Sequence, residues 1–123
     1  MSKKNFKVLI VASSFYSDIT NKMIKSAEEE LKKNKCSFEV LRVSGSLEIP
    51  TMIAIKLKKT NYDGAIALGC IIKGQTNHNE VIANTIATSL INISVKNLKP
   101  VANAVLSCNN LKQALARTGG SKN

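Results

Sequence analysis

Short apolar runs of strand length alternate along the chain with longer segments in which apolar residues recur at helical spacing. Continuous apolar runs of this kind are typical of strands that are buried on both faces of a parallel sheet. Strands are predicted at residues 8–12, 38–43, 64–69 and 101–106, and each is followed by a predicted helix. This alternation predicts one α/β domain over residues 1–123, a three-layer α/β/α sandwich in which helices cover both faces of a parallel four-stranded sheet.

The helical segments carry apolar stripes and recognisable ends. The stripe of the first helix repeats every four residues and comprises Ile19, Met23, Ala27 and Leu31. Pro50 is predicted to open the second helix, since proline is tolerated at the first helical position. Asn109 and Asn110 are predicted to cap the last helix. The predicted buried face of the third helix consists of Val81, Ile82, Thr85, Ile86, Leu90 and Ile93.

The chain carries a formal net charge of +10, which raises the question of a nucleic-acid partner. Residues 1–61 contain 12 basic and 6 acidic side chains and residues 62–123 contain 6 and 2, so neither half is a basic tail. The three phenylalanines and two tyrosines are scattered rather than interleaved with arginine, as base stacking would require. No nucleic-acid partner is therefore expected.

The absence of a long apolar stretch and the spacing of the cysteines indicate where the protein is located and whether it binds a metal. No apolar stretch is long enough to span a bilayer, and the N-terminal residues lead straight into a strand, so a cytoplasmic protein without a membrane partner is expected. Cys36, Cys70 and Cys108 lie outside any Cys-x-x-Cys spacing, which indicates neither a disulfide framework nor a zinc site. They are expected to be buried small hydrophobes. With His78 as the only histidine, neither a metal nor another cofactor is expected.

Ligands of such folds collect beyond the carboxyl ends of the strands, where four segments are predicted to meet. These are residues 13–16, 44–48, 73–78 and 107–109. At Gly69 a strand is predicted to run into a glycine turn that leads to a helix. Free backbone N–H groups at such a helix start suit a phosphate or another anion, and Lys73 adds positive charge.

His78 stands at this helix start, where a histidine can transfer protons during catalysis. A capping or surface role is an equal alternative. The spacing from Gly69 to Thr76 also mimics the phosphate loop of nucleoside triphosphatases. Gln75 stands where that motif needs a lysine, so an ATPase is not favoured.

Three other residues have a functional and a purely structural interpretation. Phe15 follows the first strand and either stacks on a flat ring or covers the core. Glu48 near the second helix start either accepts hydrogen bonds from a polyhydroxylated ligand or is simply favoured by the helix dipole. Arg117 either clamps a phosphate or is a solvated charge.

Four separated motifs carry a resemblance to a known family. They are Phe15, Ser44-Gly45-Ser46-Leu47-Glu48-Ile49-Pro50, Gly69-Cys70-Ile71-Ile72-Lys73-Gly74-Gln75-Thr76-Asn77-His78 and Gln113-Ala114-Leu115-Ala116-Arg117. In their order and spacing the chain resembles the 6,7-dimethyl-8-ribityllumazine synthases over essentially its whole length. The resemblance implies a flavodoxin-like fold and a transferase that catalyses the penultimate step of riboflavin biosynthesis, without a cofactor. In that step 5-amino-6-ribitylaminouracil condenses with 3,4-dihydroxy-2-butanone 4-phosphate.

The resemblance also implies roles for individual residues. His78 would be catalytic and would move protons during imine formation, phosphate loss and ring closure. Gln75, Thr76 and Arg117 would hold the phosphate, with Arg117 coming from a neighbouring subunit. The pyrimidine ring, with its ribityl chain, would be bound by Phe15, Ser46, Leu47, Glu48, Cys70, Ile71, Ile72 and Asn103. Family members are homopentamers or multiples of pentamers, with active sites between subunits.

The chain departs from the family pattern at several positions. Tyr16 replaces a common asparagine, and Leu47 and Asn103 stand where aromatic residues are frequent. Residues 121–123 stand where the family usually continues into a further C-terminal helix, so that a truncated chain and a shortened family member are both open. The alternative function is therefore a catalytically weakened or inactive α/β protein that binds a flavin precursor or a phosphate ligand.

Overall fold

The computed structural model describes residues 5–73 and 78–118. The predicted alternation of strands and helices is confirmed. The strands are β1 (Lys7–Ser13), β2 (Ser37–Val43), β3 (Gly64–Ile72) and β4 (Val101–Cys108). The helices are α1 (Ser17–Lys33), α2 (Ile49–Lys59), α3 (His78–Asn97) and α4 (Leu111–Arg117), and a 3-10 turn, η1 (Ser46–Glu48), precedes α2.

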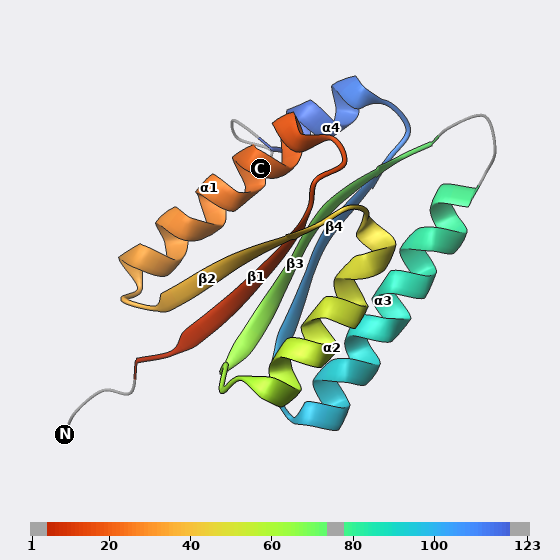
Figure 1. The fold of residues 1–123 in the computed structure, drawn as a ribbon. Helices are drawn as coiled ribbons and strands as arrows, with labels where there is room; N and C mark the ends of the chain where they lie inside the picture. Colours follow the sequence, from red (N-terminus) through yellow and green to blue (C-terminus); the bar gives the residue numbers. More distant parts are fainter. Residues whose placement is uncertain (1–4, 74–77, 119–123) are drawn as a thin grey trace.

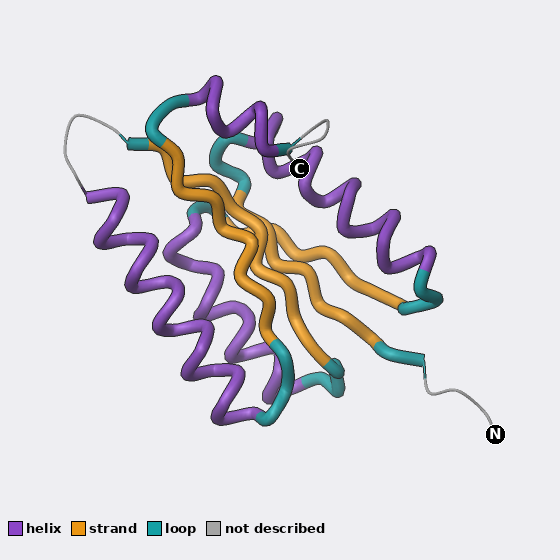
Figure 2. Tube along the Cα trace, turned by 180° about the vertical axis from the view of Figure 1, so that it is seen from behind, coloured by secondary structure: helices purple, strands orange, loops and turns teal. Residues whose placement is uncertain are grey.

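The four strands form one parallel sheet in the order β2-β1-β3-β4. Helices α1 and α4 cover one face of this sheet and α2 and α3 cover the other, as Figures 1 and 2 show from opposite sides. The predicted three-layer sandwich is thus confirmed, with the flavodoxin-like strand order that places β1 and β3 at its centre. Because the strands are parallel, all four carboxyl ends lie at one edge of the sheet.

Two apolar layers hold the sandwich together. The larger layer lies between the sheet and helices α2 and α3, and the smaller layer lies under α1 and α4. Strand β1 contributes to both, because Leu9 and Val11 face one layer while Ile10 and Ala12 face the other. The stripe predicted on α1 packs as expected: Ile19 is fully buried, and Met23, Ala27 and Leu31 are half-buried. Among the described residues, no helix is both long and apolar enough to cross a membrane.

The prediction that Gly69 begins a turn was wrong. Strand β3 continues through Gly69 and Cys70 as far as Ile72, and β4 runs beside it over this whole length. The glycine is needed for close approach, since a Cβ atom at this position would lie 2.6 Å from the Ser46 side-chain oxygen. Gly69 therefore lets the segment after β2 pack directly against β3.

Two predicted buried positions of α3 were also wrong. Val81 is 64% exposed and Thr85 is exposed, whereas Ile86 and Leu90 are fully buried against α2 and the sheet. The helix is apolar on more than one side, so its spacing alone did not reveal which side packs inward. The cysteine prediction held only in part, because Cys70 and Cys108 are buried free thiols but Cys36 is half-buried.

Candidate active site

A cavity of about 270 Å³ lies at the carboxyl edge of the sheet, on the side of α2 and α3. It is formed where the segments that follow β1 and β2 meet the end of β3 and the first turns of α3. Its lining consists of Phe15, Tyr16, Gly45, Ser46, Leu47, Glu48, Cys70, Ile71, Ile72 and Ile82. The structure thus brings together seven of the twelve residues that the sequence had suggested as site residues.

The segment after β1 presents an aromatic pair to this cavity. Phe15 is 63% exposed, and the Tyr16 ring packs edge-on against it with ring centroids 4.8 Å apart and planes inclined by 75°. The backbone beneath the rings is held by hydrogen bonds from Ser14 N–H to the Val43 carbonyl (2.7 Å) and from Phe15 N–H to the Ser13 hydroxyl (3.1 Å). Phe15 therefore offers an open ring face on an anchored segment.

The segment after β2 supplies a carboxylate. Glu48 is exposed, and its Oε1 accepts a hydrogen bond of 2.9 Å from the Ser44 hydroxyl. Gly45 lies beneath it, where an added Cβ atom would approach Oε1 to 3.2 Å. The structure corrects the expected helix start, because Pro50 is the second residue of α2 and Glu48 ends the preceding 3-10 turn. The carboxylate can accept hydrogen bonds from hydroxyl groups of a bound ligand.

The end of β3 forms an apolar wall of the cavity. Cys70, Ile71 and Ile72 contribute to it, and Cys70 is 3% exposed. Burial raises the pKa of the Cys70 thiol to about 11, and the nearby Cys108 adds to the rise. The thiol therefore stays protonated at neutral pH and serves as a wall rather than as a nucleophile.

The start of α3 carries the candidate proton-transfer group. His78 is exposed at the first residue of α3, and the neighbouring Asn79 side chain donates a hydrogen bond of 3.4 Å to the Ser107 hydroxyl at the end of β4. The predicted phosphate contacts Gln75 and Thr76 lie outside the described residues. Within residues 5–73 and 78–118, no group of three or more His, Cys, Asp or Glu side chains is arranged to hold a metal ion.

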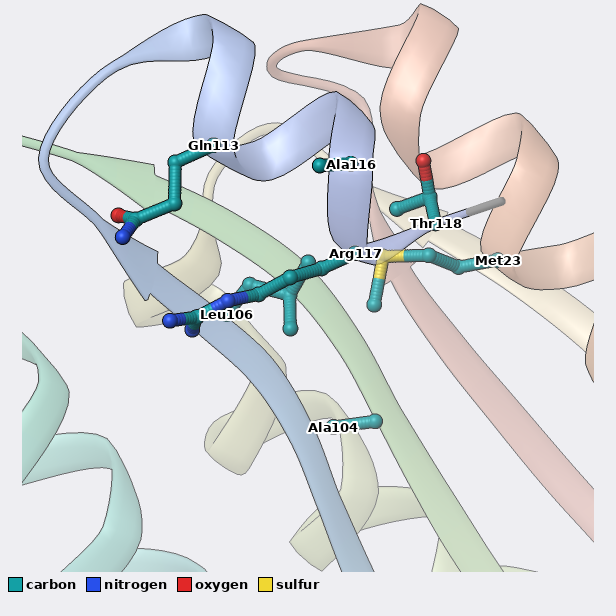
Figure 3. A pocket seen from close by; sticks show the side chains of 7 residues that line it. All are labelled: Met23, Ala104, Leu106, Gln113, Ala116, Arg117 and Thr118. Atoms are coloured by element: carbon teal, nitrogen blue, oxygen red, sulfur yellow. The ribbon is translucent and has the colours of Figure 1, made fainter. Parts of the chain in front are cut away.

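Three of the suggested site residues that the structure describes, His78, Arg117 and Asn103, are not among the residues that line this cavity. Arg117 belongs to α4, on the opposite face of the sheet, and lines a separate groove of about 530 Å³ together with Met23, Ala104 and Leu106. Figure 3 shows the Arg117 side chain extended from α4 over this groove. Asn103 is exposed on the edge strand β4, where its Oδ1 accepts a 3.0 Å hydrogen bond from Val105 N–H.

Three lining residues were not assigned to the ligand from the family motifs. Tyr16 and Gly45 lie in the segments 13–16 and 44–48 that were expected at the carboxyl edge, whereas Ile82 was expected only as part of an apolar helix face. The position of Tyr16 and Gly45 directly after strands of a parallel sheet is the signal that had placed both segments there. Ile82 gave no such signal, because its spacing on α3 is equally that of a core residue.

Comparison with known proteins identifies the family to which this chain belongs. A family model described as 6,7-dimethyl-8-ribityllumazine synthase matches residues 5–123. The chain is 38% identical to the 6,7-dimethyl-8-ribityllumazine synthase of Bartonella bacilliformis, over 97% of this chain and 80% of that protein. It is 39% identical to 6,7-dimethyl-8-ribityllumazine synthase 1 of Rhodopseudomonas palustris, over 90% of this chain and 71% of that protein. It is 40% identical to the 6,7-dimethyl-8-ribityllumazine synthase of Beijerinckia indica, over 95% of this chain and 66% of that protein. The chain therefore belongs to the 6,7-dimethyl-8-ribityllumazine synthase family.

Proposed function

We propose that this chain is a riboflavin-biosynthesis transferase that condenses 5-amino-6-ribitylaminouracil with 3,4-dihydroxy-2-butanone 4-phosphate to give 6,7-dimethyl-8-ribityllumazine, in the cytoplasm. Family membership supports the reaction. The observation that carries the assignment of the site is the cavity at the carboxyl edge, where an open aromatic ring, a carboxylate and an apolar wall converge.

The parts of the cavity match the parts of the first substrate. The flat pyrimidine ring stacks on Phe15, whose ring is exposed and anchored at its backbone. Ser46, Leu47 and Glu48 bind the ribityl chain, and the Glu48 carboxylate accepts hydrogen bonds from its hydroxyl groups. The apolar end of β3, from Cys70 to Ile72, closes the far side of the ring.

The phosphate of the second substrate is held near the start of α3 by Gln75 and Thr76. His78 moves protons as the amine forms an imine with the ketone, as phosphate leaves and as the second ring closes. Holding both substrates in reacting geometry supplies much of the remaining acceleration.

Arg117 and Asn103 complete the site from a neighbouring subunit of a homopentamer. Within one chain Arg117 belongs to α4, and α4 lies on the face of the sheet opposite to α3 (Figure 1). Apolar side chains on the outer side of α3 support an assembly, since Val81, Ile91 and Val95 are each more than 60% exposed. A pentamer of 13.3 kDa chains has a mass of about 66 kDa, which light scattering measures directly.

Lumazine formation from both purified substrates, followed by absorbance, tests the reaction. His78→Ala should lower kcat by about 10²- to 10⁴-fold while changing substrate affinity little, as expected when a proton-transfer group is lost. Substrate binding without turnover in the wild-type chain would instead favour the alternative of an inactive binding protein.

Mixed oligomers test the shared site. Neither His78→Ala nor Arg117→Ala alone should be fully active, but refolding the two together in equal amounts should give about a quarter of sites with both native groups. At the same total protein concentration, the activity of the mixture should therefore exceed the average of the two separate variants. If His78 and Arg117 served the same site from one chain, mixing would restore nothing.

A further inference from the structure

Tyr16 combines an unfavourable backbone conformation with a contact to the ring that we assign to the substrate. Its φ of 57° and ψ of 53° lie in the left-handed region, which asparagine and glycine adopt far more readily than an aromatic residue. It is also the N-cap of α1, a position that normally has extended backbone and a short polar side chain, and its side chain makes no capping hydrogen bond. Capping of α1 therefore does not explain why this residue is a tyrosine.

Hydrogen bonds on both sides maintain this conformation. The Tyr16 carbonyl accepts from Ile19 N–H (2.9 Å) and Thr20 N–H (3.1 Å), while Ser14 N–H and Phe15 N–H are bonded on the other side. A strained residue persists only where its surroundings determine it in this way, and such residues cluster at functional sites. The strain fixes the direction in which the Tyr16 side chain leaves the backbone.

That direction brings the Tyr16 ring edge-on to Phe15, with the two centroids 4.8 Å apart. Tyr16 is 37% exposed and Phe15 is 63% exposed, so the pair stands at the surface rather than within the core. Both rings line the cavity with Leu47 and Glu48. An exposed phenylalanine without a neighbour has several rotamers to lose when a ligand binds, whereas a ring held by its neighbour loses fewer.

We propose that Tyr16 is a positioning residue, whose ring holds Phe15 in the orientation that stacks on the pyrimidine substrate. This inference rests on the proposed function, in which Phe15 is the stacking surface. It concerns the side chain of Tyr16 and not its backbone. The predicted signature is selective: affinity for the pyrimidine substrate depends on the ring at position 16, and affinity for the four-carbon phosphate does not.

Three variants separate the ring from the backbone strain. Tyr16→Phe keeps the ring, and Tyr16→Asn removes the ring but readily adopts the left-handed conformation. Lys35→Asn is the control for backbone strain, because Lys35 has a φ of 59° in the turn before β2, far from the cavity. Tyr16→Asn should raise the KM of the pyrimidine substrate by about 2- to 12-fold, the equivalent of one aromatic pair, with kcat and the KM of the phosphate substrate little changed. Tyr16→Phe should retain the wild-type KM. Lys35→Asn should change neither KM.

Calorimetric titration of the pyrimidine substrate alone makes the test independent of turnover. A loss of affinity in Tyr16→Asn with wild-type affinity in Tyr16→Phe would support the proposal. This holds even if the wild-type chain forms no lumazine, because the absence of turnover would overturn only the proposed function. Unchanged affinity in Tyr16→Asn would overturn the role of the ring, as would an equal loss in Tyr16→Phe. Equal increases in both KM values would show a general structural effect instead, and absence of any binding to the wild-type chain would overturn the proposal as well.

Discussion

Polar and aromatic side chains contact one another at the amino end of the parallel sheet and are exposed at its carboxyl end. At the amino end, Tyr62 donates a hydrogen bond to the Glu39 carboxylate, and Lys7 Nζ lies 3.7 Å from Glu39 Oε1 and 5.0 Å from the centre of the Tyr62 ring. Two hydrogen bonds also join Lys7 and Asp63, because Lys7 N–H donates to the Asp63 side-chain carboxylate and Asp63 N–H donates to the Lys7 carbonyl. These groups are partners of one another.

At the carboxyl end the comparable groups face outward. Phe15 and Leu47 are each more than half exposed around the cavity, and the Glu48 carboxylate is exposed beside them. A backbone strain at Tyr16 is maintained there as well. The contrast indicates that changes at the amino end should cost stability, whereas changes at the carboxyl end should cost activity.

Glu48→Gln, at the carboxyl end, is expected to have the largest effect on activity among the substitutions that test this contrast. The substitution keeps the size of the side chain but removes the charge that would strengthen hydrogen bonds to ribityl hydroxyls, each worth about 1.5–3 kcal/mol. We expect kcat/KM for the pyrimidine substrate to fall by about 10- to 150-fold. The free energy of unfolding should change by less than about 0.5 kcal/mol, because Glu48 is exposed. A loss of stability without a loss of activity would show that Glu48 serves the fold.

Gly69→Ala tests the point where the site and the core meet. The added Cβ atom would lie 2.6 Å from the Ser46 side-chain oxygen and 3.3 Å from Ile49 Cδ1, so the Ser46 side chain must shift. Overpacking of this kind costs about 1–3 kcal/mol, measurable by urea unfolding, and displacement of Ser46 should raise the KM of the pyrimidine substrate.

Adding Ser46→Gly to Gly69→Ala provides the matched control, because it removes the side-chain oxygen that the new methyl group meets. Part of the lost stability should return in this double variant. Equal destabilisation of the single and double variants would place the cost elsewhere, for example at Ile49.

Gly69 also illustrates what the sequence could and could not predict. The four strands and four helices follow from local periodicity, capping residues and turn residues, all of which are readable along the chain. The role of Gly69 depends on Ser46, which lies 23 positions earlier and approaches it only in the folded sheet. A local pattern therefore suggested a turn where a long-range contact requires a glycine.

The site residues likewise fall into those that the local sequence places correctly and those that depend on long-range contacts. Phe15, Ser46 to Glu48 and Cys70 to Ile72 directly follow or end strands, and the parallel topology alone brings them to one edge. Arg117 and Asn103 lie elsewhere in the single chain, and no periodicity relates them to the cavity. The exposed positions of α3 were missed because apolar residues on several sides of a helix do not reveal which side faces the core.

Tyr62→Phe tests the amino end. The ring is 3% exposed and would remain packed, but Glu39 would lose its hydrogen-bond donor, at a cost of about 0.5–1.5 kcal/mol in the free energy of unfolding. Lumazine formation should be unchanged, because Tyr62 lies at the far edge of the sheet from the cavity. An equal loss of activity and stability would remove the distinction between the two ends.

The pH dependence of that stability difference sharpens the test. Burial, with the Glu39 carboxylate adding to it, raises the pKa of Tyr62 to about 12 from an ordinary value of about 10. A hydroxyl whose pKa is raised on folding stabilises the folded state fully below the unfolded value and loses this contribution as pH rises through the folded value. The stability gap between the wild-type protein and Tyr62→Phe should therefore be constant between about pH 6 and 9 and close between about pH 10 and 12. The hydrogen bond from Tyr62 also lowers the pKa of the Glu39 carboxyl, so the Glu39 titration does not cancel and the comparison is made above the pH range in which a carboxyl group titrates. A gap that stays constant up to pH 12 would show that the Tyr62 hydroxyl is not coupled to folding.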